Sequence, residues 1–300
     1  MKKNILVSVV VVSYNAEKTI IETLDSIKEQ TYKNIELIIS DDCSKDETIS
    51  ICRKWLIENK KYFISSTLFT ASVNQGVCKN FNKAIFAAQG EWIKIIAADD
   101  KLLPNCIDDY VHFVIKNNKA TFVTSVQMNY KNTFTEENCL NSNCIEKNIS
   151  VFEKSASEQL KIMAYRIFVN APTMFFKKSL FELVGGFDEQ YVYEDHPFYI
   201  NILEAGHKIY FMNKPTVCYR IHDSISNSNK KLFNYEFSRC SKKFRINRCC
   251  KYYKLNQRIS IKWYYGLLDF FEKHGMNRKT QFNESLFVFF KHIISFVGKF

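Results

Sequence analysis

Two adjacent carboxylates, Asp99 and Asp100, follow a short apolar run that starts at Glu91. Carboxylate oxygens are the hard ligands that Mg²⁺ and Mn²⁺ prefer in proteins. A strand that stops in such a pair is therefore a candidate metal site. The alternative is that the pair only marks a turn before Pro104, because Asp is common in turns.

The elements that must position this pair are visible as apolar runs that alternate with amphipathic segments over the first 125 residues. The predicted strands are 5–12, 35–40, 63–70, 91–97 and 120–127. The predicted helices are 17–29, 47–58, 77–88 and 104–116. This alternation is typical of an α/β fold whose parallel sheet is covered by helices on both faces. In such sheets, ligands bind beyond the carboxyl ends of the strands, where the strand order reverses.

Polar residues follow three of the predicted strands, at 13–15, at 41–46 and at the acidic pair. The sequence has neither a GxGxxG loop nor a GxxxxGK[ST] loop, so neither of these phosphate cradles is present. If a nucleoside diphosphate binds at these strand ends, a metal ion must neutralise it. The structural alternative at the second strand is that Asp41 or Asp42 is a turn residue and that Asp46 caps the next helix.

Four segments carry a resemblance to a known family. They are VSVVVVSYNAEKTIIETLDSIKEQTYKNIELIISDDCSKDET, NQGVCKNFNKAIFAAQGEWIKIIAADD, GGFDEQYVYEDHPFYINILEAG and VCYRIHDSIS. In this order they resemble the family 2 glycosyltransferases, and bacterial surface-polysaccharide enzymes among them. The resemblance covers about residues 5–226. It implies the GT-A fold, which is a Rossmann-like, mixed and mostly parallel sheet flanked by helices.

The resemblance also implies roles for residues on the donor side. Val12, Ser13 and Tyr14 would line the pocket of the nucleotide base, and Asp42 would accept a hydrogen bond from that base, as from the uracil N3–H of a UDP-sugar.

The family's DxD motif corresponds to Asp99 and Asp100, with Ala98 in the first position. This x-Asp-Asp form implies that Asp100 is the favoured ligand of Mn²⁺ or Mg²⁺. Asp99 would lie nearer the ribose or the sugar and could also be a metal ligand.

On the acceptor side, Asp195 corresponds to the catalytic base of the family, with Glu194 and then His196 as weaker rivals. Asp195 also reads as the N-cap of a helix that has Pro197 in its first turn. Arg220 and His222 follow a strand-like run and could approach the diphosphate and the metal, with His222 as a further metal ligand. A lone His is more often structural.

Two other segments bear on the acceptor side. Gly185 and Gly186 are read either as a turn that places Phe187 and Asp188 near the acceptor or as a helix stop. Residues 128–150, which are rich in Asn, Thr, Glu and Lys, are predicted to be a mobile insertion between the donor half and the acceptor half.

The chain's formal charge of +11 is concentrated at its end. Residues 231–300 hold 15 Lys or Arg against 4 Asp or Glu, whereas residues 1–230 hold 27 of each sign. This tail is predicted to be helical at 233–253, 257–274 and 279–297. It is either a basic, amphipathic surface for anionic lipid or a helical subdomain that packs on the core or on a second chain. No nucleic-acid reader module is recognisable.

Composition limits the remaining possibilities. A hydrophobic fraction of 46% and an aromatic fraction of 15% argue against disorder. Ten scattered cysteines without a CxxC pair favour reduced thiols and a cytoplasmic location. The start, Met-Lys-Lys and an apolar run, lacks a small-residue cleavage site and is read as the first strand. No run reaches the approximately 20 apolar residues of a membrane span.

These observations combine into one prediction. Residues 1–230 form a glycosyltransferase domain, with a nucleotide-sugar half (1–127) and an acceptor half (128–230), followed by the basic region 231–300. The enzyme is expected to use a metal ion to transfer a sugar with inversion, from a nucleotide-sugar donor to a glycan or lipid-linked acceptor. It would work in the cytoplasm or on the cytoplasmic face of the plasma membrane, alone or as a homo-oligomer. The alternative is a non-catalytic protein that retains the fold to bind a nucleotide sugar or a glycan.

Overall fold

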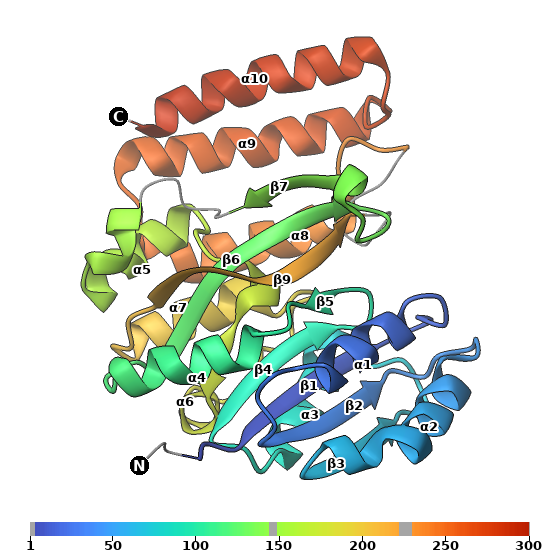
Figure 1. Ribbon diagram of the computed structural model, residues 1–300. Coiled ribbons are helices and arrows are strands. Elements are labelled where there is room, and N and C mark those ends of the chain that lie inside the picture. Colours follow the sequence, from blue (N-terminus) through green and yellow to red (C-terminus); the bar gives the residue numbers. More distant parts are fainter. Residues whose placement is uncertain (1–3, 144–148, 222–229, 300) are drawn as a thin grey trace. The chain divides into compact units, whose positions relative to one another are not determined.

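The protein is described here by a computed structural model, which covers residues 4–143, 149–221 and 230–299. Its described residues form one nine-stranded sheet in the order β3-β2-β1-β4-β8-β6-β9-β5, with β7 paired to β6 (Figure 1). The strands are β1 (Val7–Ser13), β2 (Ile35–Asp41), β3 (Ser65–Thr70), β4 (Trp92–Ala97), β5 (Lys101–Leu102), β6 (Phe122–Lys131), β7 (Cys139–Asn143), β8 (Phe175–Lys177) and β9 (Tyr210–Ile221). Strands β1 to β4 are parallel, and β8 pairs antiparallel with both β4 and β6. The prediction of an α/β, GT-A-like sheet is confirmed.

Helices follow the strands in the order that the sequence predicts. They are α1 (Ile20–Lys28), α2 (Thr48–Asn59), α3 (Val77–Ala87), α4 (Cys106–Lys116), α5 (Ala156–Tyr165), α6 (Lys178–Leu183), α7 (Asp195–Glu204), α8 (Tyr235–Phe244), α9 (Leu255–Lys273) and α10 (Gln281–Lys299). Short 3-10 turns at Lys60–Tyr62, Glu136–Asn138, Ile149–Glu153 and Ala171–Thr173 join some of them.

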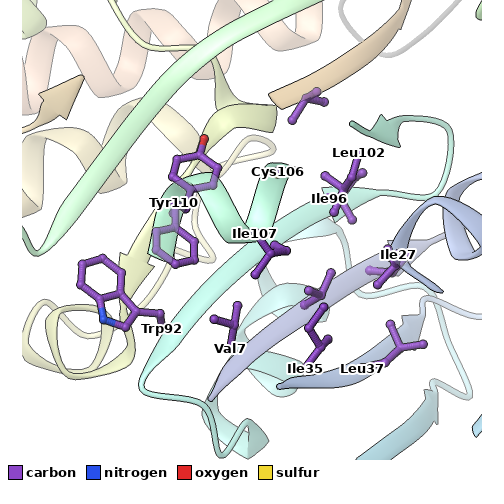
Figure 2. Packing of buried hydrophobic residues seen from close by; sticks show 14 of the residues in the cluster. Val7, Ile27, Ile35, Leu37, Trp92, Ile96, Leu102, Cys106, Ile107 and Tyr110 are labelled. Atoms are coloured by element: carbon purple, nitrogen blue, oxygen red, sulfur yellow. The ribbon is translucent and has the colours of Figure 1, made fainter. Parts of the chain in front are cut away.

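The central strands β1 and β2 are buried along their whole length. Near-continuous apolar runs are expected where helices cover both faces of a parallel sheet. Alternate residues of β1 and β2, such as Val7 and Leu37, join Ile27 of α1 and Ile107 of α4 in one core cluster (Figure 2). Full burial of each such side chain contributes roughly 1.5–3 kcal/mol. This core fixes the strand ends that carry the polar residues.

Lys94 lies in the middle of β4 and is fully buried. Its ammonium donates hydrogen bonds to the carbonyl oxygens of Ile95 (2.8 Å) and Pro172. Burial lowers the pKa of Lys94 to about 8. The carbonyl of Pro172 precedes β8, so this buried cation joins the donor-half strand β4 to the segment that leads into β8.

The described residues from 128 to 143 form paired strands, where the sequence predicts a mobile insertion over 128–150. Strand β6 continues through Lys131, and β7 returns beside it as an antiparallel partner. The other edge of β6 pairs with β9 in parallel. Pairing on both sides stabilises this stretch as sheet despite its polar composition. The described part of the predicted insertion is therefore a β-hairpin.

Two compact units make up the chain: Met1–Gln159 with Phe168–Ile221, and Leu160–Ile167 with His222–Phe300. In the second unit, α8 is followed by a π-helical turn (Arg245–Cys249) and a 3-10 turn (Cys250–Tyr252). The predicted helix 233–253 is thus shorter and changes its winding after Phe244. Helices α9 and α10 lie side by side (Figure 1). Within the described residues, no helix is long and apolar enough to cross a bilayer.

Candidate active site

The carboxyl ends of β1 and β2 are tied into one platform. Ser13 is in register with Asp41, and the N–H of Asp42 donates to the Ser13 carbonyl oxygen at 2.9 Å. The side-chain oxygens of Asp41 accept from the hydroxyls of Ser13 and Ser44 and from the Ser44 N–H. Asp41 is therefore the turn residue of the acidic stretch 41–46.

Asp42 holds the next loop against the platform. One carboxylate oxygen accepts the N–H of Gln75 and the other accepts the N–H of Gly76, both at 2.8 Å. Gly76 has a φ of +87°, a conformation that favours glycine, and it immediately precedes α3. Each carboxylate oxygen has a second lone pair that can accept from a ligand.

Of the three residues predicted to line the base pocket, Val12 and Ser13 are buried at the end of β1, and the side chain of Tyr14 is 52% exposed. Asn15, next in the chain, has a φ of +51°, and its amide oxygen accepts the N–H of Lys45. The backbone here is fixed, and Tyr14 is left accessible to a ligand.

The acidic pair lies at the same edge of the sheet. The N–H of Ala98 donates to the Val12 carbonyl oxygen at 3.0 Å, which brings the end of β4 next to β1. Asp100 is 1% exposed and its Oδ1 accepts the backbone N–H of Arg220 at 2.9 Å. Burial raises the pKa of Asp100 well above its usual range, and the charge of Asp99 raises it further. A buried carboxylate and a half-buried one that repel each other are a donor set that a hard divalent cation stabilises.

Within 4–143, 149–221 and 230–299, no group of three His, Cys, Asp or Glu side chains is arranged to hold a metal ion. Asp99 and Asp100 fit Mn²⁺ or Mg²⁺ as a partial donor set, since such ions commonly take their remaining oxygens from phosphate and water. The other predicted ligand, His222, lies outside the described residues.

Arg220 is buried beside the acidic pair and bonds to protein groups, and its predicted approach to a diphosphate stays a prediction. Its Nε donates to the Asp99 carbonyl oxygen at 2.8 Å, and its terminal nitrogens contact the Asn132 carbonyl oxygen and the Glu22 carboxylate. The ring centroid of Phe134 lies 4.2 Å from the guanidinium carbon. Because all three of its guanidinium nitrogens bond to protein groups, Arg220 positions the segments that carry these groups.

The partners of Arg220 come from three separate segments: α1, the end of β4 and the turn of the β6–β7 hairpin. Thr23, also on α1, donates its hydroxyl to the Asp100 carbonyl oxygen at 2.7 Å. The acidic pair is thus fixed from both the helix side and the β9 side. Sequence reasoning missed Glu22, Thr23 and Phe134, because in the sequence they look like ordinary helix and loop residues.

The predicted base, Asp195, is the first residue of α7, and Glu194 occupies the N-cap position that was predicted for Asp195. Oδ1 of Asp195 accepts the N–H of His196 at 2.7 Å. Burial raises the pKa of Asp195, and burial together with the charge of Asp195 raises that of Glu194 to about 7. His196 is buried. A carboxylate whose pKa lies near neutrality is suited to accept a proton from an alcohol.

Tyr219 connects the two acidic pairs. Burial raises the pKa of Tyr219 to about 12, and the charges of Asp100, Asp99 and Glu194 contribute to the rise. These charges therefore act on one phenol group, in strand β9 beside Arg220. Both carboxylates of the 99–100 pair and the Glu194 carboxylate thus lie within electrostatic range of Tyr219.

Two further features concern residues that flank Asp195 in the sequence. The hydroxyl of Tyr199, one turn into α7, is buried and has no hydrogen-bond partner among the described residues. The amide of Asn82 on α3 bonds both the N–H and the carbonyl of Phe187 at 2.9 Å. Gly185 and Gly186, both with positive φ, end α6. The helix-stop reading of the two glycines is thus confirmed, and Phe187 packs in the core, not toward an acceptor.

Comparison with known proteins identifies the family. The family described as Glycosyl transferase family 2 matches residues 8–183. The chain belongs to this family, and it is a glycosyltransferase with the GT-A fold, a class of enzyme that uses nucleotide-sugar donors. The alternative of a non-catalytic binding protein is therefore not supported.

Particular relatives resemble the chain over most of its length. UDP-Glc:alpha-D-GlcNAc-diphosphoundecaprenol beta-1,3-glucosyltransferase WfaP of Escherichia coli is 26% identical over 225 residues, which are 75% of this chain and 81% of WfaP. TarS 1-349 of S. aureus in complex with UDP-GlcNAc is similar with a TM-score of 0.59 at 20% identity, over 85% of this chain and 70% of TarS 1-349. Mannosyltransferase PcManGT of Pyrobaculum calidifontis, in complex with GDP-Man and Mn²⁺, has a TM-score of 0.54 at 21% identity, over 72% of this chain and 56% of PcManGT.

Proposed function

We propose that this chain catalyses the inverting, metal-dependent transfer of a sugar from a UDP-sugar to a hydroxyl group of a lipid-linked or other glycan acceptor in surface-polysaccharide synthesis. The observation that carries the proposal is the geometry at the carboxyl ends of β1, β2 and β4: the N–H groups of Asp42 and Ala98 bond to adjacent β1 carbonyl oxygens, and the buried Asp100 is held by the Arg220 N–H. The charge effects of Asp99, Asp100 and Glu194 on Tyr219 support a position of the proposed base near this edge.

On the donor side, the nucleotide base would lie against Val12, Ser13 and Tyr14 and donate its N3–H to Asp42. Asp100, with Asp99 beside it, would hold Mn²⁺ or Mg²⁺ against the diphosphate. When bound, such an ion stabilises the negative charge that develops on the departing diphosphate. The rigid connection of Ser13, Asp42 and Ala98 means that little reorganisation is needed when the donor binds.

On the acceptor side, Asp195 would accept the proton of the attacking hydroxyl group as the new glycosidic bond forms and the bond to the diphosphate breaks. A single displacement from the opposite face of the sugar inverts the anomeric configuration. Raised pKa values at Asp195 and Glu194 match this role, because a base is most effective when its pKa lies near the working pH. Glu194 would then modulate the base.

The choice of a UDP-sugar and a lipid-linked acceptor follows the relatives: WfaP is named for UDP-Glc and a diphosphoundecaprenol acceptor, and TarS was crystallised with UDP-GlcNAc. We further propose that residues 1–230 form the catalytic domain and that the basic region 231–300 attaches it to the cytoplasmic face of the membrane, where such acceptors are found.

A donor screen tests the proposal. Release of the nucleoside diphosphate is measured across UDP-, GDP- and dTDP-sugars, with Mn²⁺ and with chelator, in the presence of a lipid-linked GlcNAc-diphosphate acceptor. We expect release from a UDP-sugar that chelator abolishes, and a product with inverted anomeric configuration by NMR. Undiminished release in chelator would refute metal dependence, and a product with retained configuration would refute the role of Asp195.

A further inference from the structure

The second unit contains two adjoining hollows beside α8 and α9. The larger has a volume of about 610 Å³ and is lined by apolar or small groups of Ile246, Cys250, Ile261, Tyr265 and Gly266. The smaller has a volume of about 380 Å³. Ile246 and Lys242 line both, so the hollows meet at these residues. The larger hollow is within the roughly 300–1,000 Å³ typical of small-molecule sites.

The hollows differ in chemistry. The smaller hollow is polar and cationic, with Arg239, Lys242 and Lys243 in its wall. Arg258 and Lys262 from α9 line the larger hollow, around its apolar floor. One carboxylate, Asp269, lines the smaller hollow and binds Lys242 at 2.7 Å. Five cations against one lining carboxylate leave a strong positive excess.

We propose that these hollows bind one anionic phospholipid of the membrane, with an acyl chain in the larger hollow and the phosphate headgroup among the cations of the smaller one. An apolar cavity that opens into a cationic one matches a molecule that is apolar at one end and anionic at the other. A second copy of this chain fits poorly. Its own residues 231–300 carry 15 Lys or Arg against 4 Asp or Glu, so like charges would meet. Through this site, the proposed membrane attachment of residues 231–300 would include the binding of a single lipid molecule.

The chain offers a fluorescent reporter for this site. Trp263 lies next to Lys262 on α9 and is 51% exposed, whereas Trp55 and Trp92 are buried in the first unit at 6% and 2%. The full-length protein is mixed with phosphatidylcholine vesicles that contain phosphatidylglycerol with brominated acyl chains, which quench nearby tryptophan. We expect quenching that saturates with phosphatidylglycerol, is absent with phosphatidylcholine alone, and is lost in Trp263→Phe.

Gly266→Leu tests the cavity itself. A Cβ atom at Gly266 meets no atom within 4 Å, and leucine favours a helix more than glycine does, so the new side chain fills the hollow without straining α9. We expect the quenching to fall to the phosphatidylcholine level. The control is Ser285→Leu, which adds the same side chain at an exposed position of α10 and is expected to quench like the wild type. Equal quenching in both variants would overturn the proposal.

The cations are tested by Arg258→Gln with Lys262→Gln, against the control pair Lys273→Gln with Lys279→Gln, which removes the same charge outside the hollows. Since each cation near an anionic membrane contributes about 1 kcal/mol, the first pair is expected to lower vesicle binding on the order of 30-fold and the control pair clearly less. An equal loss in both pairs would show diffuse attraction only and overturn the site. A protein dimer that Gly266→Leu dissociates would do so as well, in favour of a second copy.

The inference rests on the proposed action at a lipid-linked acceptor, but lipid binding is measured without donor or acceptor. Loss of lipid binding with intact sugar transfer to a soluble acceptor would refute the lipid site alone. Lipid binding by a protein that transfers no sugar would refute the proposed reaction alone.

Discussion

The proposed donor side and the proposed acceptor side each have two adjacent acids, and the two pairs are held differently. Asp99 and Asp100 are fixed from distant elements, by backbone and side-chain groups of Arg220 and by the hydroxyl of Thr23. Asp195 accepts the N–H of its own neighbour, His196, at the start of α7. The 99–100 pair is therefore fixed by long-range contacts, whereas the bond to Asp195 is local, and burial raises the pKa of Asp100 and Asp195 alike. Fixed geometry suits the proposed positioning of a diphosphate, and a raised pKa suits the proposed base.

The difference between the two pairs is tested most strongly at Asp195. Asp195→Asn keeps the shape of the side chain but removes the proton acceptor, so we expect transfer to fall by about 10²–10⁴-fold. Donor binding, measured by calorimetry with Mn²⁺ present, is expected to stay within a few-fold of the wild type, because the donor edge is untouched. Full activity in this variant would remove Asp195 as the base.

Asp100→Ala tests the donor pair. Loss of this carboxylate is expected to weaken donor binding in the presence of Mn²⁺ by on the order of 10–100-fold, as for other groups that support a metal site. The measurement is a Mn²⁺ titration of donor affinity, with donor binding in chelator as the reference. An unchanged Mn²⁺ midpoint would count against Asp100 as a metal ligand.

Arg220 tests whether geometry is what the donor pair needs. Arg220→Met keeps much of the side chain's bulk beside Phe134 but removes the bonds to Asp99, Asn132 and Glu22. We expect the KM for the donor and the Mn²⁺ requirement to rise about tenfold, while kcat at saturating donor and Mn²⁺ changes less.

Glu22→Gln, which leaves a neutral partner for the same guanidinium nitrogen, is the matched control and should have a smaller effect. A variant that loses kcat alone would contradict a positioning role for Arg220. Circular dichroism and thermal unfolding distinguish a positioning effect from general loss of the fold.

Local sequence patterns predicted the strands that carry this site but not the long-range hydrogen bonds that fix its side chains. Runs such as Val7–Ser13 and Ile35–Asp41 read as strands because they are short and mostly apolar, and the polar residues after them had to share one edge. The connections of Arg220 to Glu22 and Asn132 span 198 and 88 residues, and no local pattern encodes them. The burial of Lys94 could not be predicted either, because a lysine in a strand usually indicates an exposed face. The hairpin that contains β7 was missed because its polar residues are stabilised by pairing with β6.

Glu194→Gln tests whether Glu194 sets the pH dependence of the reaction, and it is expected to have the smallest effect of these variants. Glu194 has a raised pKa of about 7, so in the wild type it takes up a proton as the pH falls through about 7. If proton transfer requires the ionised pair, kcat/KM falls with pH over the same range, which is the acid limb of the pH–rate profile.

The glutamine variant has no carboxylate at 194, and Asp195 is relieved of a like charge, so the acid limb is expected to move to lower pH. Rates above pH 7.5 should stay within a few-fold of the wild type. An acid limb that stays at about 7 would show that Glu194 does not set it. Inactivity at every pH, with an active Asp195→Asn variant, would instead assign the base to Glu194.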